Sequence, residues 1–183
     1  MPVPRAAHKI LCNLRQYSHD EEGIRAVMDG AFTDISSPKL RQGLDYWNAK
    51  RGDRLMPARA DLDPMEMIPI LPNVILLDVL RDPLDFRYRL IGTVVEEHMS
   101  APYTGRRFSE FEGQRASSRI WTCSERVLNE KQPVRSDIPY IGPKSDFTTI
   151  EDIMMPLSSD GDTVDVIFIV VEYIRKQIGG GEA

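Results

Sequence analysis

The sequence has few of the features that build disulfide, metal or membrane-spanning frameworks. Its two cysteines, Cys12 and Cys123, lie far apart, which excludes a disulfide framework and the close spacing of a zinc site. The longest apolar run, residues 166–171, is well short of the roughly 20 residues that span a bilayer. The N-terminus lacks a sustained apolar stretch, so we expect no secretory signal. We therefore expect a cytoplasmic protein without a membrane partner.

Positive charge is also in short supply. The chain has 23 Lys and Arg against 28 Asp and Glu, a formal net charge of -5, which argues against a general nucleic-acid surface. Hydrophobic residues make up 42% of the 183 residues, the balance of a globular domain with a core. The terminal GGGEA predicts a flexible tail over residues 176–183.

Two helical segments are predicted ahead of the first strand. Ser37 and Pro38 suit a helix start, and the helix should end at Arg51 and Gly52. A short helix is predicted over residues 65–71, limited by neighbouring prolines. Residues 1–36 form an extension that we expect to be partly ordered.

The remaining chain predicts five strands and a helical crossover. Residues 74–80 are almost continuously apolar, residues 86–90 alternate, and the turn between them predicts a hairpin. Short helical pieces follow, and then a longer helix over residues 114–130. Three further strands are predicted, with a tight turn at residues 158–162 between the last two. Their ranges are 134–141, 148–157 and 163–173. This order predicts an α+β domain with one antiparallel sheet over residues 37–175.

The order and several motifs resemble a PAS domain. DFRYRLIGT at residues 85–93 and TGRRFSEF at 104–111 resemble the bacterial PAS pattern of a strand, a Gly-Thr and a later Thr-Gly-Arg. YWNAKRGDRLMPARADLDP at residues 46–64 resembles a stand-alone alphaproteobacterial PAS subfamily, formerly described as a domain of unknown function. The resemblance implies a five-stranded antiparallel sheet that cups short helices and one longer helix.

The resemblance also implies a sensory or interaction module rather than a particular ligand. We expect a PAS signalling module that binds a small molecule or a protein partner and signals through protein contact. A ligand-free scaffold for dimerisation and interaction is the alternative. A small cup-shaped lyase or isomerase is a third interpretation, and it would need a buried acid-base pair such as Asp78 with Asp152. We expect no enzymatic activity.

The candidate cavity wall follows from the predicted faces of strands and helices. Along residues 86–90 the alternation predicts Phe86, Tyr88 and Leu90 on one face and the arginines on the other. A buried Tyr88 hydroxyl would need a hydrogen-bond partner, which a ligand or an ordered water could supply, whereas a plain core is the alternative interpretation of this aromatic face. The candidate wall residues are Tyr88, Leu90, Val94, His98, Trp121, Cys123, Val127, Met154 and Phe168.

The sequence does not identify a cofactor, and it argues against haem and flavin. In haem-binding PAS domains the iron ligand usually lies on the long helix, which here has no histidine; His98 lies elsewhere, and His8 and His19 lie in the N-terminal extension. Cys123 lacks the motif of the flavin-binding, light-sensing branch, so we expect neither haem nor flavin, and no metal site.

Four arginines, Arg87, Arg89, Arg106 and Arg107, could bind a carboxylate or phosphate ligand. The alternative, which we favour, is pairing with surface acids. The acids in reach along the sequence are Asp85, Glu96, Glu97, Glu110 and Glu112.

The last strand is apolar on both faces, so each face needs a cover. Val166, Phe168 and Val170 are predicted on one face, and Ile167, Ile169, Val171 and Tyr173 on the other. Either the helix after Pro38 or a second subunit could cover the face that the cup leaves open, and we expect a homodimer. The candidate interface residues are Leu40, Leu44, Trp47, Ile167, Ile169, Val171 and Tyr173.

Overall fold

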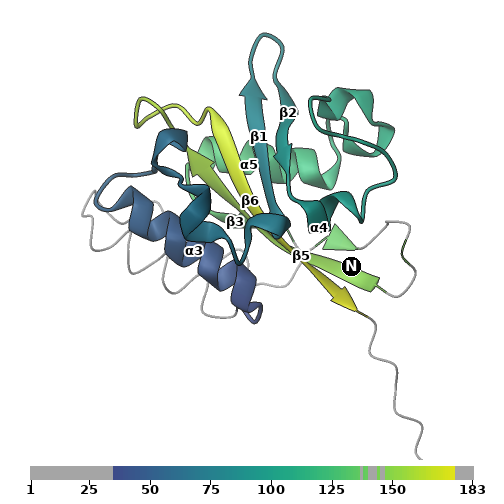
Figure 1. Cartoon of the computed structure of the whole chain (residues 1–183). Helices are drawn as coiled ribbons and strands as arrows, with labels where there is room; N and C mark the ends of the chain where they lie inside the picture. Colours follow the sequence, from purple (N-terminus) through teal and green to yellow (C-terminus); the bar gives the residue numbers. More distant parts are fainter. Residues whose placement is uncertain (1–34, 137, 140–143, 145–146, 176–183) are drawn as a thin grey trace, which may run out of the picture. The chain divides into compact units, whose positions relative to one another are not determined.

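The structure is a computed structural model that describes residues 35–136, 138–139, 144 and 147–175 (Figure 1). The chain divides into two compact units, Met1–Ser36 and Ser37–Ala183, and the second is described here. Of the extension over residues 1–36, which we expect to be partly ordered, residues 1–34 lie outside the described residues, as does the expected flexible tail 176–183. Cys12, His8 and His19 are among the residues that are not described.

Helix α3 (Pro38–Arg51) begins and ends where the sequence predicts. Ser37 is the N-cap, and its hydroxyl accepts a 3.3 Å hydrogen bond from the Leu40 backbone N–H. The helix ends at Gly52, whose φ of 56° favours a residue without a Cβ. Three short 3₁₀ segments follow, η1 (Arg59–Asp61), η2 (Pro64–Met67) and η3 (Leu71–Asn73), because prolines interrupt the helix predicted over residues 65–71.

A single antiparallel sheet forms the centre of the fold. Its path runs β2-β1-β6-β5-β3, and β4 also pairs with β5. The strands are β1 (Val74–Leu80), β2 (Asp85–Ile91), β3 (Val134–Arg135), β4 (Ile138–Pro139), β5 (Phe147–Leu157) and β6 (Val166–Arg175). Because β3 and β4 follow one another along the same edge of β5, they form one interrupted strand, and the predicted five-stranded α+β sheet is confirmed.

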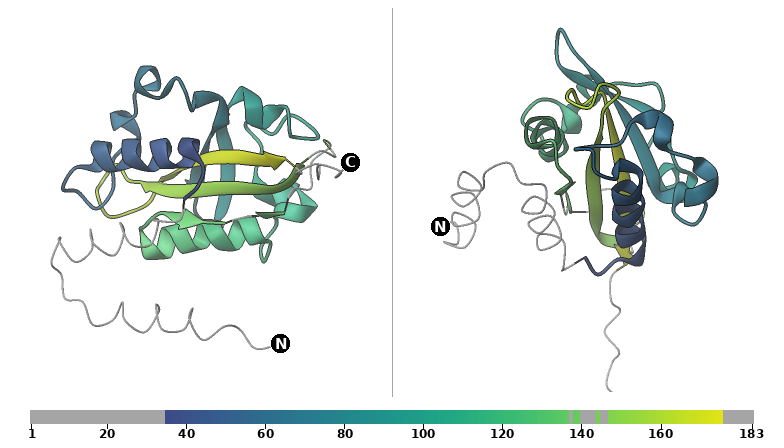
Figure 2. Two further views of the ribbon diagram at one scale, coloured as in Figure 1. Left: turned by 90° about the horizontal axis from the view of Figure 1, so that it is seen from below. Right: turned by 90° about the vertical axis from the view of Figure 1, so that its left-hand side faces the viewer.

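Helices lie on both faces of this sheet. Helix α3 contacts β5 and β6 on one face, and α5 (Arg119–Glu130) contacts β5 and β3 from the other (Figure 2). We call the face that α3 covers the outer face and the face towards α5 the inner face. The helix α4 (Thr93–Glu96) and the 3₁₀ segments η4 (Phe108–Glu110) and η5 (Glu112–Gln114) follow β2 and lead to α5.

The outer face is covered within the chain. Leu40 and Trp47 are fully buried, and the Trp47 indole N–H donates a 2.8 Å hydrogen bond to the Pro156 carbonyl. Gly43 allows close approach, since a Cβ there would lie 2.5 Å from Cγ2 of Val170. Of the two covers considered for this face, the structure has the helix, and Leu44 alone of the predicted stripe is only half-buried.

The register of β6 decides which side chains face α3. The Tyr46 ring of α3 contacts Phe168 edge-on at 6.4 Å, so Phe168 lies on the outer face with Val170. Phe168 is therefore not on the cup side, and its prediction as a cavity wall is wrong. The side chains of β6 alternate as predicted, but the two faces are exchanged relative to the prediction. The residues that face inward, away from α3, are Ile167, Ile169, Val171 and Tyr173.

A β-bulge in β2 changes the predicted faces of its residues. Leu77 pairs with Tyr88 and the adjacent Leu76 pairs with Leu90, so Arg89 is an extra residue. Because Leu76 and Leu77 point to opposite faces, Leu90 lies on the outer face and Tyr88 on the inner face. The prediction that Leu90 shares a face with Phe86 and Tyr88 is wrong for this reason.

The Gly-Thr that follows β2 marks a close backbone approach. A Cβ at Gly92 would lie 2.4 Å from the Pro72 carbonyl oxygen and 2.5 Å from that of Leu71. The Gly92 N–H donates a 2.7 Å hydrogen bond to the Val74 carbonyl. Gly92 thus fastens the start of α4 against η3, where the chain leaves the sheet.

Within the described residues, no helix combines the length and the apolar character needed to cross a membrane.

Candidate functional site

Aromatic side chains fill the inner side of the sheet next to β2. Phe86 lies 5.3 Å from Phe108 and 5.3 Å from Trp121, measured between ring centroids. Tyr88 lies 5.2 Å from Phe108. Phe86, Tyr88 and Phe108 are at most 2% exposed, and Trp121 is 7% exposed. These four residues, which we call the aromatic cluster, contact one another where a PAS ligand was expected.

The buried Tyr88 hydroxyl has a partner inside the chain. It donates a 3.1 Å hydrogen bond to Oε1 of Gln114, at the end of η5. Burial raises the pKa of Tyr88 well above its ordinary value, so the phenol stays protonated and can donate. Tyr103 and Phe111, whose rings stack at 4.0 Å, flank the same phenol. Gln114 could not be predicted from the sequence, because a single Gln in a polar loop gives no signal.

Other predicted wall residues lie near this cluster but do not form a polar site. Cys123 and Val127 are buried on α5, and Met154 is buried on the inner face of β5. Burial raises the pKa of the Cys123 thiol, and the Asp152 carboxylate adds to the effect. The thiol is therefore a poor nucleophile in this position.

Two predicted wall residues lie instead in a separate surface pocket. Val94 and His98 line a pocket of about 310 Å³ near the end of β6. The His98 ring is stacked on Tyr173, with centroids 3.7 Å apart and planes 7° apart. The other residues of its wall are Glu97, Lys144, Glu172 and Arg175.

The residues required for an acid-base pair are separated by the sheet. Asp78 pairs with Val166 and lies on the outer face, whereas Asp152 pairs with Val171 and lies on the inner face. The Asp152 carboxylate accepts a hydrogen bond from the Ser136 hydroxyl. Asp78 and Asp152 therefore cannot act on one substrate. Among the described residues, no group of three or more His, Cys, Asp and Glu could hold a metal ion.

Arginines gather on the outer face of β2. Arg87 donates to Oδ2 of Asp78 at 2.7 Å, and Arg89 donates to Oδ1 of the same carboxylate. Arg107 lies directly opposite Arg87 in an isolated antiparallel bridge. Of the expected surface pairs, Arg106 with Glu110 is present at 3.0 Å. Asp85 instead accepts hydrogen bonds from Ser109, and the arginines of β2 bind Asp78, which was not among the predicted acidic partners.

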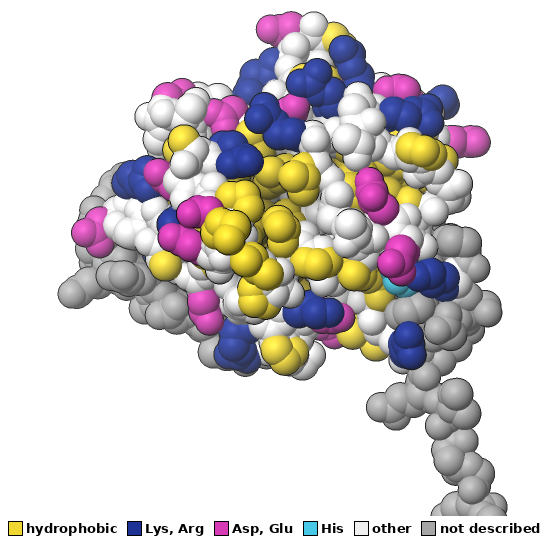
Figure 3. Space-filling model, viewed as in Figure 1, with side chains coloured by type: hydrophobic (Ala, Val, Ile, Leu, Met, Phe, Trp, Pro, Cys, Tyr) yellow, Lys and Arg dark blue, Asp and Glu magenta, His cyan; other side chains and the backbone are white. Residues whose placement is uncertain are grey.

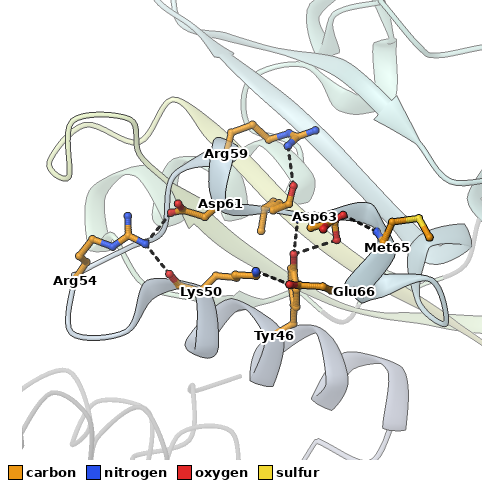
Figure 4. Close-up of polar contacts among 9 residues, drawn as sticks. Tyr46, Lys50, Arg54, Arg59, Asp61, Asp63, Met65 and Glu66 are labelled. Carbon is orange, nitrogen blue, oxygen red and sulfur yellow. Dashed lines mark hydrogen bonds and ion pairs between the residues drawn. The ribbon is translucent and has the colours of Figure 1, made fainter.

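The subfamily motif at residues 46–64 builds a braced loop on the outer face (Figure 4). Arg54 donates to Oδ2 of Asp61 at 2.7 Å, and the same oxygen accepts from the Ala58 backbone N–H at 2.8 Å. Lys50 and Glu66 form an ion pair at 2.5 Å. These contacts tie η1 and η2 to α3.

The end of the motif is fastened in the same way. The Tyr46 hydroxyl accepts a 2.7 Å hydrogen bond from the Asp63 backbone N–H. The Asp63 carboxylate accepts one of 2.9 Å from the Met65 N–H and caps η2. As a result, Met65 and Ile68 are held outward, with 72% and 54% of their surfaces exposed.

These features define an α+β domain with a five-stranded antiparallel sheet, a filled inner side and a braced apolar loop on the outer face. A family model of the PAS domain matches residues 35–171. The chain belongs to the PAS domain family, whose members are typically sensory and signalling modules.

One solved structure similar to this chain is a fungal LOV domain photoreceptor. It is 17% identical, with a TM-score of 0.43, and the alignment covers 79% of this chain and 100% of that one. No curated protein matches the chain.

Proposed function

We propose that this PAS domain is a non-enzymatic signalling module that acts through protein–protein contact, with an inner side that holds its own aromatic residues in place of a ligand. One observation carries the proposal: the Tyr88 hydroxyl is satisfied by Gln114 while its ring packs on Phe108. A ligand in this place would have to displace those contacts. The separation of Asp78 from Asp152 supports a role without catalysis.

Native mass spectrometry of the purified full chain, with an absorbance scan, tests the ligand-free inner side. We expect the mass of the bare polypeptide and no absorbance band beyond that of the aromatic residues. A retained small molecule that is released on unfolding would contradict the proposal. A Phe108→Ala variant, which opens space beside Tyr88, serves as the comparison that should gain affinity for small apolar molecules.

The surface pocket favours a second candidate function, the sensing of a small polar molecule. Its wall combines the stacked rings of His98 and Tyr173 with carboxylate and cationic side chains. A thermal-shift screen against metabolites tests it, because binding to the native state raises Tm. A compound that raises the Tm of the wild type but not of Tyr173→Ala would support this candidate over the first.

The homodimer remains a prediction. Leu40 and Trp47 are buried against the chain's own sheet, so they are not available to a second subunit. A dimer would have to use other apolar residues, and Met65 and Ile68 are the most exposed of the large ones described. Light scattering at micromolar concentration decides between a mass of one chain and a mass of two.

A further inference from the structure

An apolar and a basic area adjoin on the outer surface. Figure 3 shows Lys and Arg side chains over the β1–β2 hairpin and hydrophobic side chains directly below them, over the η1–η3 segment. Met65 and Ile68 are the exposed large hydrophobic residues of that segment, and Pro64 and Pro69 beside them are exposed as well. Such a patch with a charged rim is typical of a protein interface.

The basic side of this surface carries uncompensated charge. Arg87 and Arg89 share one carboxylate, that of Asp78, whose side chain is only 9% exposed, and Arg107 lies directly opposite Arg87. The Arg87 and Arg89 side chains are 45% and 49% exposed, so both guanidinium groups still have donors that face solvent. Within the described part of the chain, the Arg107 side chain has no ion pair. Like charges directly opposite each other, as in Arg87 and Arg107, are destabilising unless an anion lies close by.

Two acidic residues beside the apolar side are paired with cations, and the carboxylate of a third, Asp63, accepts a hydrogen bond from the Met65 N–H. Glu66 pairs with Lys50 and Asp61 pairs with Arg54. A second copy of the chain, rotated onto this surface, would therefore bring few free carboxylates to the arginines. The net charge of -5 makes the local positive excess unusual for this chain. A phosphate backbone alone would leave the exposed Met65 and Ile68 without an apolar contact.

We propose that this surface, made by Met65, Ile68, Arg87, Arg89 and Arg107, binds a segment of another protein in which carboxylates flank apolar side chains. The inference rests on the proposed function and names the partner's chemistry. Met65 suits an adaptable apolar contact because its side chain is unbranched and flexible. The guanidinium groups can each hold a carboxylate in a bidentate geometry. The braced loop keeps the apolar residues in place before binding, which lowers the entropy cost of association.

Site-specific photocrosslinking of the full chain in its own cells tests the surface. p-Benzoylphenylalanine in place of Ile68 should crosslink to a protein segment whose sequence combines Asp or Glu with apolar residues. The same probe in place of Asn129, exposed on α5, is the matched control position. The crosslinked segment is then synthesised, and its Kd is measured by fluorescence anisotropy.

The charge variants make the proposal specific. Arg107→Glu should weaken the Kd of the synthetic segment about tenfold at low salt, because like charges then meet across the interface. Arg126→Glu, an equal charge change on α5, should leave the Kd unchanged. Ile68→Ser should also weaken binding. Exchange of the segment's carboxylate for Lys should restore binding to Arg107→Glu.

A crosslink from position 68 to a second copy of the chain, to RNA or to a segment without carboxylates overturns the inference. Equal Kd values for Arg107→Glu and Arg126→Glu overturn it as well. A protein captured from position 129 but not from 68 overturns the inference and leaves the proposed function standing. Capture from neither position contradicts both.

Discussion

The hydroxyl of Tyr88 on β2 and the side-chain carbonyl of Gln114 at the end of η5 are joined by a 3.1 Å hydrogen bond across the inner side of the domain. This bond connects the sheet to the segment that leads into α5. It also satisfies a polar group that is only 2% exposed. The phenol therefore needs neither a ligand nor a water, and the segment before α5 is held by a side chain of the sheet.

Removal of Gln114 should destabilise the domain more than its position in a loop indicates. We expect Gln114→Leu to lower the free energy of unfolding by about 1–3 kcal/mol, because the Tyr88 hydroxyl is then buried without a partner. Tyr88→Phe in the same chain should recover part of the loss. Urea unfolding followed by Trp fluorescence measures both. Additive effects of the two substitutions would show that the bond does not couple them.

Gly92 should be intolerant of any side chain. Because a Cβ there would lie 2.4–2.5 Å from backbone atoms of Leu71 and Pro72, the backbone itself must move. We expect Gly92→Ala to cost more than about 3 kcal/mol or to prevent folding. Gly113→Ala is the matched control, since nothing lies within 4 Å of a Cβ at Gly113. Circular dichroism melts of the two variants provide the measurement, and equal Tm values would contradict the role assigned to Gly92.

The bounds of the helices and strands could be predicted from the sequence more closely than the face of the sheet on which each side chain lies. Helix α3 and strand β1 have the predicted bounds, because a Ser-Pro start and an apolar run are local signals. The face of Leu90 could not be predicted, because the bulge at Arg89 depends on pairing with β1. The side of Phe168 could not be predicted either, since both faces of β6 are apolar and only the position of α3 distinguishes them.

The candidate site shows the same limit. Alternation places Tyr88 on a buried face, and this residue is indeed buried in the aromatic cluster, against Phe108. Its partner Gln114 lies 26 residues further along the chain, in a loop without periodicity, so no local pattern connects the two. His98 and Tyr173 likewise meet through the tertiary fold, which divides the predicted wall into two separate places.

Gly43 should be required for the close packing of α3 on the sheet. In an isolated helix Ala is more stable than Gly by about 1 kcal/mol, but a Cβ at this position would lie 2.5 Å from the buried Val170 side chain. We expect Gly43→Ala to destabilise the domain by about 1–3 kcal/mol. Gln42→Ala, at the exposed neighbouring position, should be neutral or slightly stabilising.

A compensating variant tests the cause. Val170→Ala removes the methyl groups that the new Cβ would meet, so the double variant Gly43→Ala/Val170→Ala should be more stable than the sum of the single effects predicts. Guanidinium unfolding curves measure the three variants. Strict additivity would mean that the loss at Gly43 arises elsewhere.

Asp160 should make the β5–β6 turn sensitive to acid. Its carboxylate accepts hydrogen bonds from the Asp162 and Thr163 N–H groups and from the Ser158 hydroxyl, and these bonds hold the pKa of Asp160 well below its ordinary value. The charged form is therefore favoured in the folded state. Its stabilising effect is present above the unfolded pKa of about 4 and is lost as the pH falls towards the folded pKa.

We expect Asp160→Asn to be less stable than the wild type at pH 7, and the difference to shrink as the pH falls below 4. Asp53→Asn, which removes an equal charge from an exposed turn, is the control. Chemical unfolding at pH 7, 5 and 3 measures the difference, and a gap between Asp160→Asn and the wild type that does not change with pH would contradict this account.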